Sequence, residues 1–150
     1  MIEQRRADAG DALSLGRLRA ASMIEMGYLP ANDRAPFERR AADDFRRLFR
    51  ANRLIAWVLC DADRVIGSAC ATLFERLPYP EGALHAEVAG VYVEPAYRGR
   101  GHASRLVEAV LADVAGYGVR TTYLRPSPLS KSLYERLGFT DDDRSTMRLS

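Results

Sequence analysis

The chain has 150 residues, of which 47% are hydrophobic and 28% charged, a composition typical of a globular protein. This length predicts a single domain over residues 1–150, long enough to bury a substantial core. The formal net charge is only +2, so no global electrostatic attraction to nucleic acid is expected.

The N-terminal residues 1–6 lack an apolar signal core, and no run of about 18 apolar residues occurs in the sequence. We therefore expect a cytoplasmic protein without a membrane partner. Cys60 and Cys70 lie in apolar segments typical of strands, where buried free thiols are the expected state. Two cysteines at this spacing do not form a zinc site, so we expect no metal.

The first quarter of the chain predicts a short strand and a helix. Residues 1–6 could form the strand, and Asp8 is a plausible helix N-cap with Asp11 three residues later. The helix should extend to about Met26, with Gly27 as its stop. Its apolar face is formed by Ala12, Leu15, Leu18 and Ser22. The charged side chains expected on its solvated face are Arg17, Arg19 and Glu25.

A second helix should begin at Pro36, a residue that suits the first helical position, and end near Asn52. Its apolar stripe has helical spacing and predicts a core-facing surface: Phe37, Ala41, Phe45, Leu48 and Phe49.

Three strands should follow, at residues 54–60, 65–74 and 84–93. The turn at residues 61–63 makes the first two antiparallel, which indicates a mixed α/β sheet rather than a doubly wound parallel one. The third strand should be central, and Gly90 is a plausible bulge within it.

Residues 98–103 form a glycine-rich turn between this strand and an amphipathic helix over about residues 101–115. The first N–H groups of a helix lack internal partners and carry partial positive charge, so such a junction binds anions. Gly99 and Gly101 let a phosphate approach the backbone, and Arg98 and Arg100 add charge. We therefore predict a phosphate or pyrophosphate ligand here.

Two other phosphate-binding loops fit this stretch less well. The sequence contains no G-x-x-x-x-G-K-[ST] segment, which argues against a nucleoside-triphosphate loop. A dinucleotide-binding G-x-G-x-x-G loop would need a third glycine where Ser104 stands.

The C-terminal part predicts a strand over residues 119–125 and a short helix from Ser130 to Leu137. Ser130 can cap this helix, and Gly138 fits a left-handed helix end. Residues 147–149 are expected to form the remnant of a last strand.

Two segments resemble the GNAT superfamily of acyl-CoA-dependent N-acyltransferases. Arg98-x-x-Gly101-x-Ala103 fits its R/Q-x-x-G-x-G/A signature, and residues 133–139 (LYERLGF) are similar to its LYEKLGF segment. The two segments occur in the family's order and at about its spacing, and the resemblance is strong over residues 84–140.

The resemblance implies a mixed sheet whose central strand and its parallel neighbour splay apart to admit the pantetheine arm of acetyl-CoA. It assigns the cofactor-binding positions to Val91, Tyr92, Val93, Arg98, Gly99, Arg100, Gly101, His102, Ala103, Ser104, Ser127 and Tyr134. Ser127 is shorter than the asparagine that the family more often has at this place.

The chemistry implied is direct transfer of an acyl group from a thioester to an amine. A protonated amine must lose a proton before it attacks, and Glu87 is the candidate base. Other candidates are Glu75, Glu81 and His85. A backbone N–H within residues 91–93 can stabilise the oxyanion, and Tyr134 resembles the family's tyrosine that donates a proton to the leaving thiolate.

The sequence thus predicts an acetyl-CoA-dependent N-acetyltransferase that acts on a primary amine of a small molecule or peptide, as a monomer or homodimer. The alternative is a non-catalytic acyl-CoA-binding sensor or interaction module with the same fold. A nucleic-acid-binding module is a distant third, motivated only by the arginines.

Overall fold

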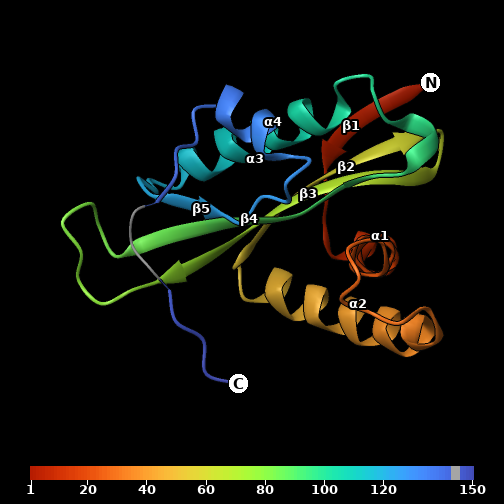
Figure 1. The fold of residues 1–150 in the computed structure, drawn as a ribbon, viewed down its shortest axis with the longest axis horizontal. Coiled ribbons are helices and arrows are strands. Elements are labelled where there is room, and N and C mark those ends of the chain that lie inside the picture. The colour runs from red at the N-terminus through yellow and green to blue at the C-terminus, as the bar shows by residue number, and fades with distance from the viewer. Residues whose placement is uncertain (143–145) are drawn as a thin grey trace.

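The computed structural model describes residues 1–142 and 146–150, which contain a five-stranded mixed sheet in the order β1-β2-β3-β4-β5. The first four strands run antiparallel to their neighbours, and β5 runs parallel to β4 (Figure 1). The strands are β1 (Ile2–Arg6), β2 (Leu54–Asp61), β3 (Arg64–Glu75), β4 (Leu84–Val93) and β5 (Thr122–Leu124). The mixed sheet with an antiparallel half is therefore confirmed.

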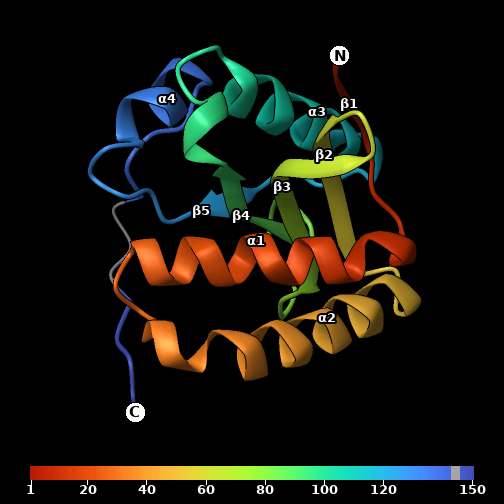
Figure 2. The same cartoon turned by 90° about the vertical axis from the view of Figure 1, so that its right-hand side faces the viewer.

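Helices cover both faces of this sheet (Figures 1 and 2). Helices α1 (Ala12–Glu25) and α2 (Arg34–Arg50) cover one face, which we call the α1–α2 face. Helices α3 (His102–Gly116) and α4 (Lys131–Arg136) cover the other, the α3–α4 face. Each face has its own buried cluster, the larger one beneath α3 and the smaller one beneath α1.

The predicted helix start at Asp8 is confirmed. The Asp8 carboxylate accepts a hydrogen bond from the Gly10 N–H at 2.8 Å, and Asp11 accepts one from the Asp8 N–H at 3.0 Å. These two bonds satisfy backbone donors that a helix start leaves free. One short 3-10 turn, Ala9–Asp11, intervenes before α1 begins.

Strand β4 contains a bulge at Gly90, as predicted. Its pairing with β3 shifts register opposite residues 68–70, and Gly90 adopts a φ of +65° that disfavours other residues. The Ser68 hydroxyl donates to the Gly90 carbonyl at 2.8 Å and so holds the bulged backbone.

Strands β4 and β5 pair over only three residues each. The register joins Ala86 to Thr122 and ends at Val88 with Leu124, whereas β4 continues to Val93. The second half of β4 therefore extends past the end of β5, which confirms the expected splay. The strand predicted over residues 119–125 is shorter than expected, since only Thr122–Leu124 pair with β4.

Three details of the sequence prediction are wrong. Residues 147–149 form no strand, because they reach no neighbouring strand, and Met147 and Leu149 are 94% and 100% exposed. Helix α2 begins at Arg34, before Pro36. Ser130 occupies the N-cap position of α4, but its hydroxyl bonds to Ser127 instead of capping the helix.

No helix within the described residues is both long and apolar enough to cross a membrane. Cys60 and Cys70 are buried free thiols, as predicted.

Candidate functional site

The turn between β4 and α3 presents an uninterrupted series of free backbone donors. Within the described part of the chain, the N–H groups of residues 99–104 donate to no backbone or side-chain acceptor. The first helical bond at this end is Arg105 N–H to Gly101 O, at 3.2 Å. Free donors at the positive end of a 15-residue helix form a site for an anion.

Two glycines give this turn its shape. Gly99 and Gly101 have φ values of +79° and +78°, where most side chains would be strained. A Cβ on Gly99 would meet nothing within 4 Å, so the space beside that backbone is open to a ligand. The Arg100 side chain is exposed next to it, and Ala103 and Ser104 are half-buried in the first turn of α3.

His102, at the start of α3, is turned toward Arg105. Its Nδ1 accepts a hydrogen bond from Arg105 Nη2 at 2.8 Å, which leaves the proton of the neutral ring on Nε2. Nε2 is buried and has no partner among the described residues. Burial, and then the charges of Arg105 and Arg100, lower the His102 pKa, so the ring is favoured in its neutral form.

The Arg98 side chain is held away from the free N–H groups. Its guanidinium forms two bonds to Glu25 at the end of α1, at 2.9 and 2.8 Å, and lies over the Tyr92 ring at 5.2 Å. Its Nε donates to the Val93 carbonyl at 2.7 Å. The first residue of the signature thus fixes the loop to α1, and its charge is already paired.

The exposed edge of β4 lies beside the turn. The Glu94 N–H donates to Ile66 O of β3 at 2.9 Å, so alternation along the strand directs the Val91 and Val93 N–H groups toward the opposite edge. That is the edge from which β5 diverges. An extended ligand could form strand-like hydrogen bonds there.

Tyr134 of α4 lies on the α3–α4 face. It is 7% exposed, packs in the larger cluster, and meets Phe139 edge to face at a centroid distance of 5.9 Å. Burial raises its pKa, which keeps the phenol protonated and able to donate. Ser127 precedes this helix, and its hydroxyl is 2.9 Å from that of Ser130.

Glu87 lies on the α1–α2 face. In the register between β3 and β4, Glu87 lies opposite Thr72. Thr72 is two residues from Cys70, whose side chain packs in the cluster beneath α1, so Glu87 faces the same side of the sheet. It is half-buried and also lies opposite Tyr123, one residue before the β4–β5 pairing ends. Glu87 and Tyr134 therefore lie on opposite faces of the sheet.

The alternative bases are placed less favourably. His85 is fully buried, and both ring nitrogens have partners, the Tyr123 hydroxyl at 3.2 Å and the Gly82 carbonyl at 3.1 Å. Glu75 and Glu81 are exposed at the ends of the β3–β4 loop.

Of the three charges of α1 expected on its solvated face, Arg17 and Glu25 form ion pairs and Arg19 is turned toward the sheet. Arg17 pairs with Glu94 at 2.9 Å and also bonds to the Val65 carbonyl, and Glu25 pairs with Arg98. Arg19 is half-buried and faces the sheet. The sequence could have indicated that Arg19 faces the core, since residues 15, 18, 19 and 22 share one helical face and the other three are uncharged.

Comparisons with known proteins agree with this geometry. The structure aligns with a predicted acetyltransferase from Clostridium acetobutylicum, solved with acetyl-CoA, over 99% of this chain and 96% of that one, with a TM-score of 0.89 and 21% identity. It aligns with a GCN5-related N-acetyltransferase from Ralstonia eutropha JMP134 over 99% of both chains, with a TM-score of 0.85 and 20% identity. An aminoglycoside N-acetyltransferase in complex with CoA aligns over 100% of this chain and 95% of that one, with a TM-score of 0.74 and 19% identity.

No curated protein matches the chain by sequence. The family model described as "Acetyltransferase (GNAT) family" matches residues 21–139, which contain the free N–H groups, the exposed edge of β4 and Tyr134. The predicted family, and with it acetyl-CoA as the family's cosubstrate, is confirmed: the chain belongs to the GNAT acetyltransferase family.

Proposed function

We propose that this protein is an acetyl-CoA-dependent N-acetyltransferase that moves an acetyl group to a primary amine of a small molecule or peptide by direct attack. The observation that carries the proposal is the series of free N–H groups at residues 99–104, placed beside the edge of β4 that β5 leaves. A pyrophosphate attached to an extended arm matches this pair of features.

The residues present fit acetyl-CoA. The free N–H groups and the open space at Gly99 can receive the pyrophosphate, and exposed Arg100 adds positive charge. The Val91 and Val93 N–H groups can bind the pantetheine arm and stabilise negative charge on the acetyl oxygen. When bound, acetyl-CoA supplies the activated acetyl group.

Glu87 and Tyr134 have separate parts in this proposal. Glu87, on the α1–α2 face, accepts the proton of the attacking ammonium, directly or through water. Tyr134, on the α3–α4 face, donates its proton toward the leaving sulfur. Their positions on opposite faces keep the two proton transfers apart, so the base does not compete with the acid for the same proton.

The experiment is to incubate the protein with acetyl-CoA and a panel of primary amines while free thiol release is followed. We expect amine-dependent release above the hydrolysis background, with the acetylated amine identified by mass spectrometry. A protein that binds CoA but acetylates none of the amines would be the sensor module instead. Retention on duplex DNA that falls with salt would indicate the nucleic-acid alternative.

A further inference from the structure

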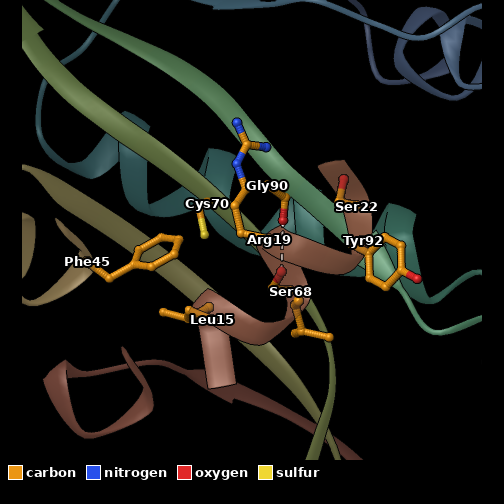
Figure 3. Close-up of a pocket in the computed structure, with 9 residues that line it drawn as sticks. Leu15, Arg19, Ser22, Phe45, Ser68, Cys70, Gly90 and Tyr92 are labelled. Carbon is orange, nitrogen blue, oxygen red and sulfur yellow. Dashed lines mark hydrogen bonds between the residues drawn. The ribbon is translucent and has the colours of Figure 1, made fainter. Parts of the chain in front are cut away.

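Arg19 places a positive charge on the side of α1 that faces the sheet. It lies on the inward side of α1 with Leu15, Leu18 and Ser22, and these residues line a cavity of about 10 Å³ against the sheet. Cys70 and Gly90 form its wall on β3 and β4, and Figure 3 shows the Arg19 side chain extending past both toward β4. A cavity of this size holds roughly one water molecule, so a larger ligand group would meet the guanidinium beyond the cavity, on the side toward β4.

The Arg19 guanidinium has no hydrogen bond or ion pair with any residue in the described parts of the chain. Two other arginines that contact α1 or belong to it differ from Arg19 in this respect, because Arg17 is paired with Glu94 and Arg98 with Glu25. Burial lowers the Arg19 pKa, the reverse of the shift in Arg98. A half-buried cation without a counter-ion is unfavourable unless a ligand supplies the opposite charge.

The groups around Arg19 do not neutralise it. Burial raises the pKa of the Cys70 thiol to about 12, so that sulfur is uncharged near neutral pH. The negative charge of Glu87 is close enough to raise the Arg19 pKa, yet the two side chains form no ion pair. Glu87, the candidate base, and the unpaired Arg19 therefore lie on the same face of the sheet without contacting each other.

We propose that Arg19 binds a carboxylate of the acceptor, so that the amine substrate is an amino acid or a peptide that presents a free carboxylate near its reacting amine. This inference rests on the proposed acetyltransferase function. The ammonium group would lie toward Glu87 and the carboxylate toward Arg19, and the four charges would cancel. The planar guanidinium can form two parallel bonds to a carboxylate.

A phosphate is a poorer match for this site. A phosphomonoester carries a charge of about −1.5 to −2 near pH 7 and would face one guanidinium with the Glu87 carboxylate nearby. The cavity wall formed by Leu15, Leu18 and Cys70 offers no second cation.

The test compares free amino acids with their amides, which carry the amine at the same position but no carboxylate charge, with each rate expressed per free amine present at the assay pH. We expect wild-type kcat/KM to favour the acids by roughly ten- to hundredfold, the range for a charge-assisted hydrogen bond. Arg19→Gln should lose this preference, because its kcat/KM should fall much further with the acids than with the amides. Arg39→Gln, an exposed arginine of α2, is the matched control and should keep it. Equal rates with acids and amides in wild type would overturn the proposal.

Two further measurements separate the possible failures. If no amine is acetylated, the proposed function fails, and the proposal is then judged by calorimetric binding of an amino acid and its amide to the CoA-saturated protein. Binding of the acid alone, lost in Arg19→Gln, supports it, and equal affinity overturns it. A higher rate with an aminoalkyl phosphate than with the matching amino acid would overturn the choice of carboxylate.

A structural role for Arg19 would give a different result. If the cation stabilises the fold, Arg19→Gln should lower the melting temperature and affect acids and amides equally, which would contradict the proposal. If it serves a ligand, the melting temperature should stay or rise, because an unpaired half-buried charge is removed. Arg19→Lys keeps the charge but loses the planar fork, and we expect it to retain part of the preference for acids.

Discussion

Arg98 and Glu25 form a doubly hydrogen-bonded ion pair that joins the loop after β4 to the end of α1. The Nη1–Oε1 and Nη2–Oε2 distances are 2.9 and 2.8 Å, and the guanidinium also covers the Tyr92 ring. The arginine that opens the family signature thereby holds the loop after β4 against the end of α1.

The first prediction concerns this ion pair. Because the two side chains are 41% and 49% exposed, Glu25→Gln should cost only about 0.5–1 kcal/mol of unfolding free energy at pH 7. The hydrogen bond to Arg98 holds the Glu25 pKa below its ordinary value of 4.5. The pair's contribution is thus complete above pH 4.5 and is lost as the pH falls through the lowered pKa.

Urea denaturation at a series of pH values measures this difference. The wild-type and Glu25→Gln curves should converge toward acid pH, where Glu25 becomes protonated. A constant difference at every pH would show that the effect comes from packing and not from charge.

The second prediction concerns the free N–H groups. Gly99→Asp should abolish CoA binding, because it places a negative charge where the pyrophosphate is proposed to bind. Gly118→Asp is the matched control, since both glycines have φ near +80° and neither would bring a Cβ within 4 Å of another atom. Both variants should therefore lose similar stability from backbone strain, of about 1–2 kcal/mol at most.

A thermal-shift titration with CoA compares the two variants. Ligand at about 100 times its dissociation constant should stabilise wild type and Gly118→Asp by roughly 2.7 kcal/mol. Gly99→Asp should show no shift. If CoA stabilised Gly99→Asp as much as wild type, the pyrophosphate would bind elsewhere. Gly101→Asp should also lose binding, although its Cβ would lie 3.0 Å from Arg105, which makes it the less clean variant.

The third prediction tests Glu87 as the base. Glu87→Gln should lower kcat most at low pH, where the amine is protonated, by about 10²–10⁴-fold for a lost general base. As the pH approaches the pKa of the amine, free amine becomes available and the variant should recover. The measurement is a pH–rate profile with one good amine, and a profile parallel to that of wild type would exclude Glu87.

The fourth prediction tests Tyr134 as the acid. Tyr134→Phe keeps the edge-to-face contact with Phe139 and removes only the hydroxyl, so the melting temperature should change little. The rate should fall by about 10²–10⁴-fold with CoA affinity retained. High pH should not rescue this variant, because free amine cannot replace a missing proton donor. Recovery at high pH, as in Glu87→Gln, would remove Tyr134 from this role.

Local features of the chain could be predicted from the sequence because they depend on neighbouring residues. Asp8 and Asp11 form the expected N-terminal cap, Gly90 forms the bulge, and the glycine-rich turn leaves the N–H groups of residues 99–104 free. Each follows from backbone geometry within a few residues. The strand expected at residues 147–149 failed because a strand needs a neighbour, and no local pattern supplies one.

Tertiary structure alone decided which groups meet at the site. Helical spacing placed Arg19 on the same face as Leu15 and Leu18, but only the packing of α1 on the sheet brought its charge close enough to Glu87 to affect the Arg19 pKa. Arg98 was expected to face a phosphate and pairs instead with Glu25, a residue 73 positions earlier. The sequence determines which side chains are charged, whereas the partner and the burial of each charge depend on contacts between distant segments.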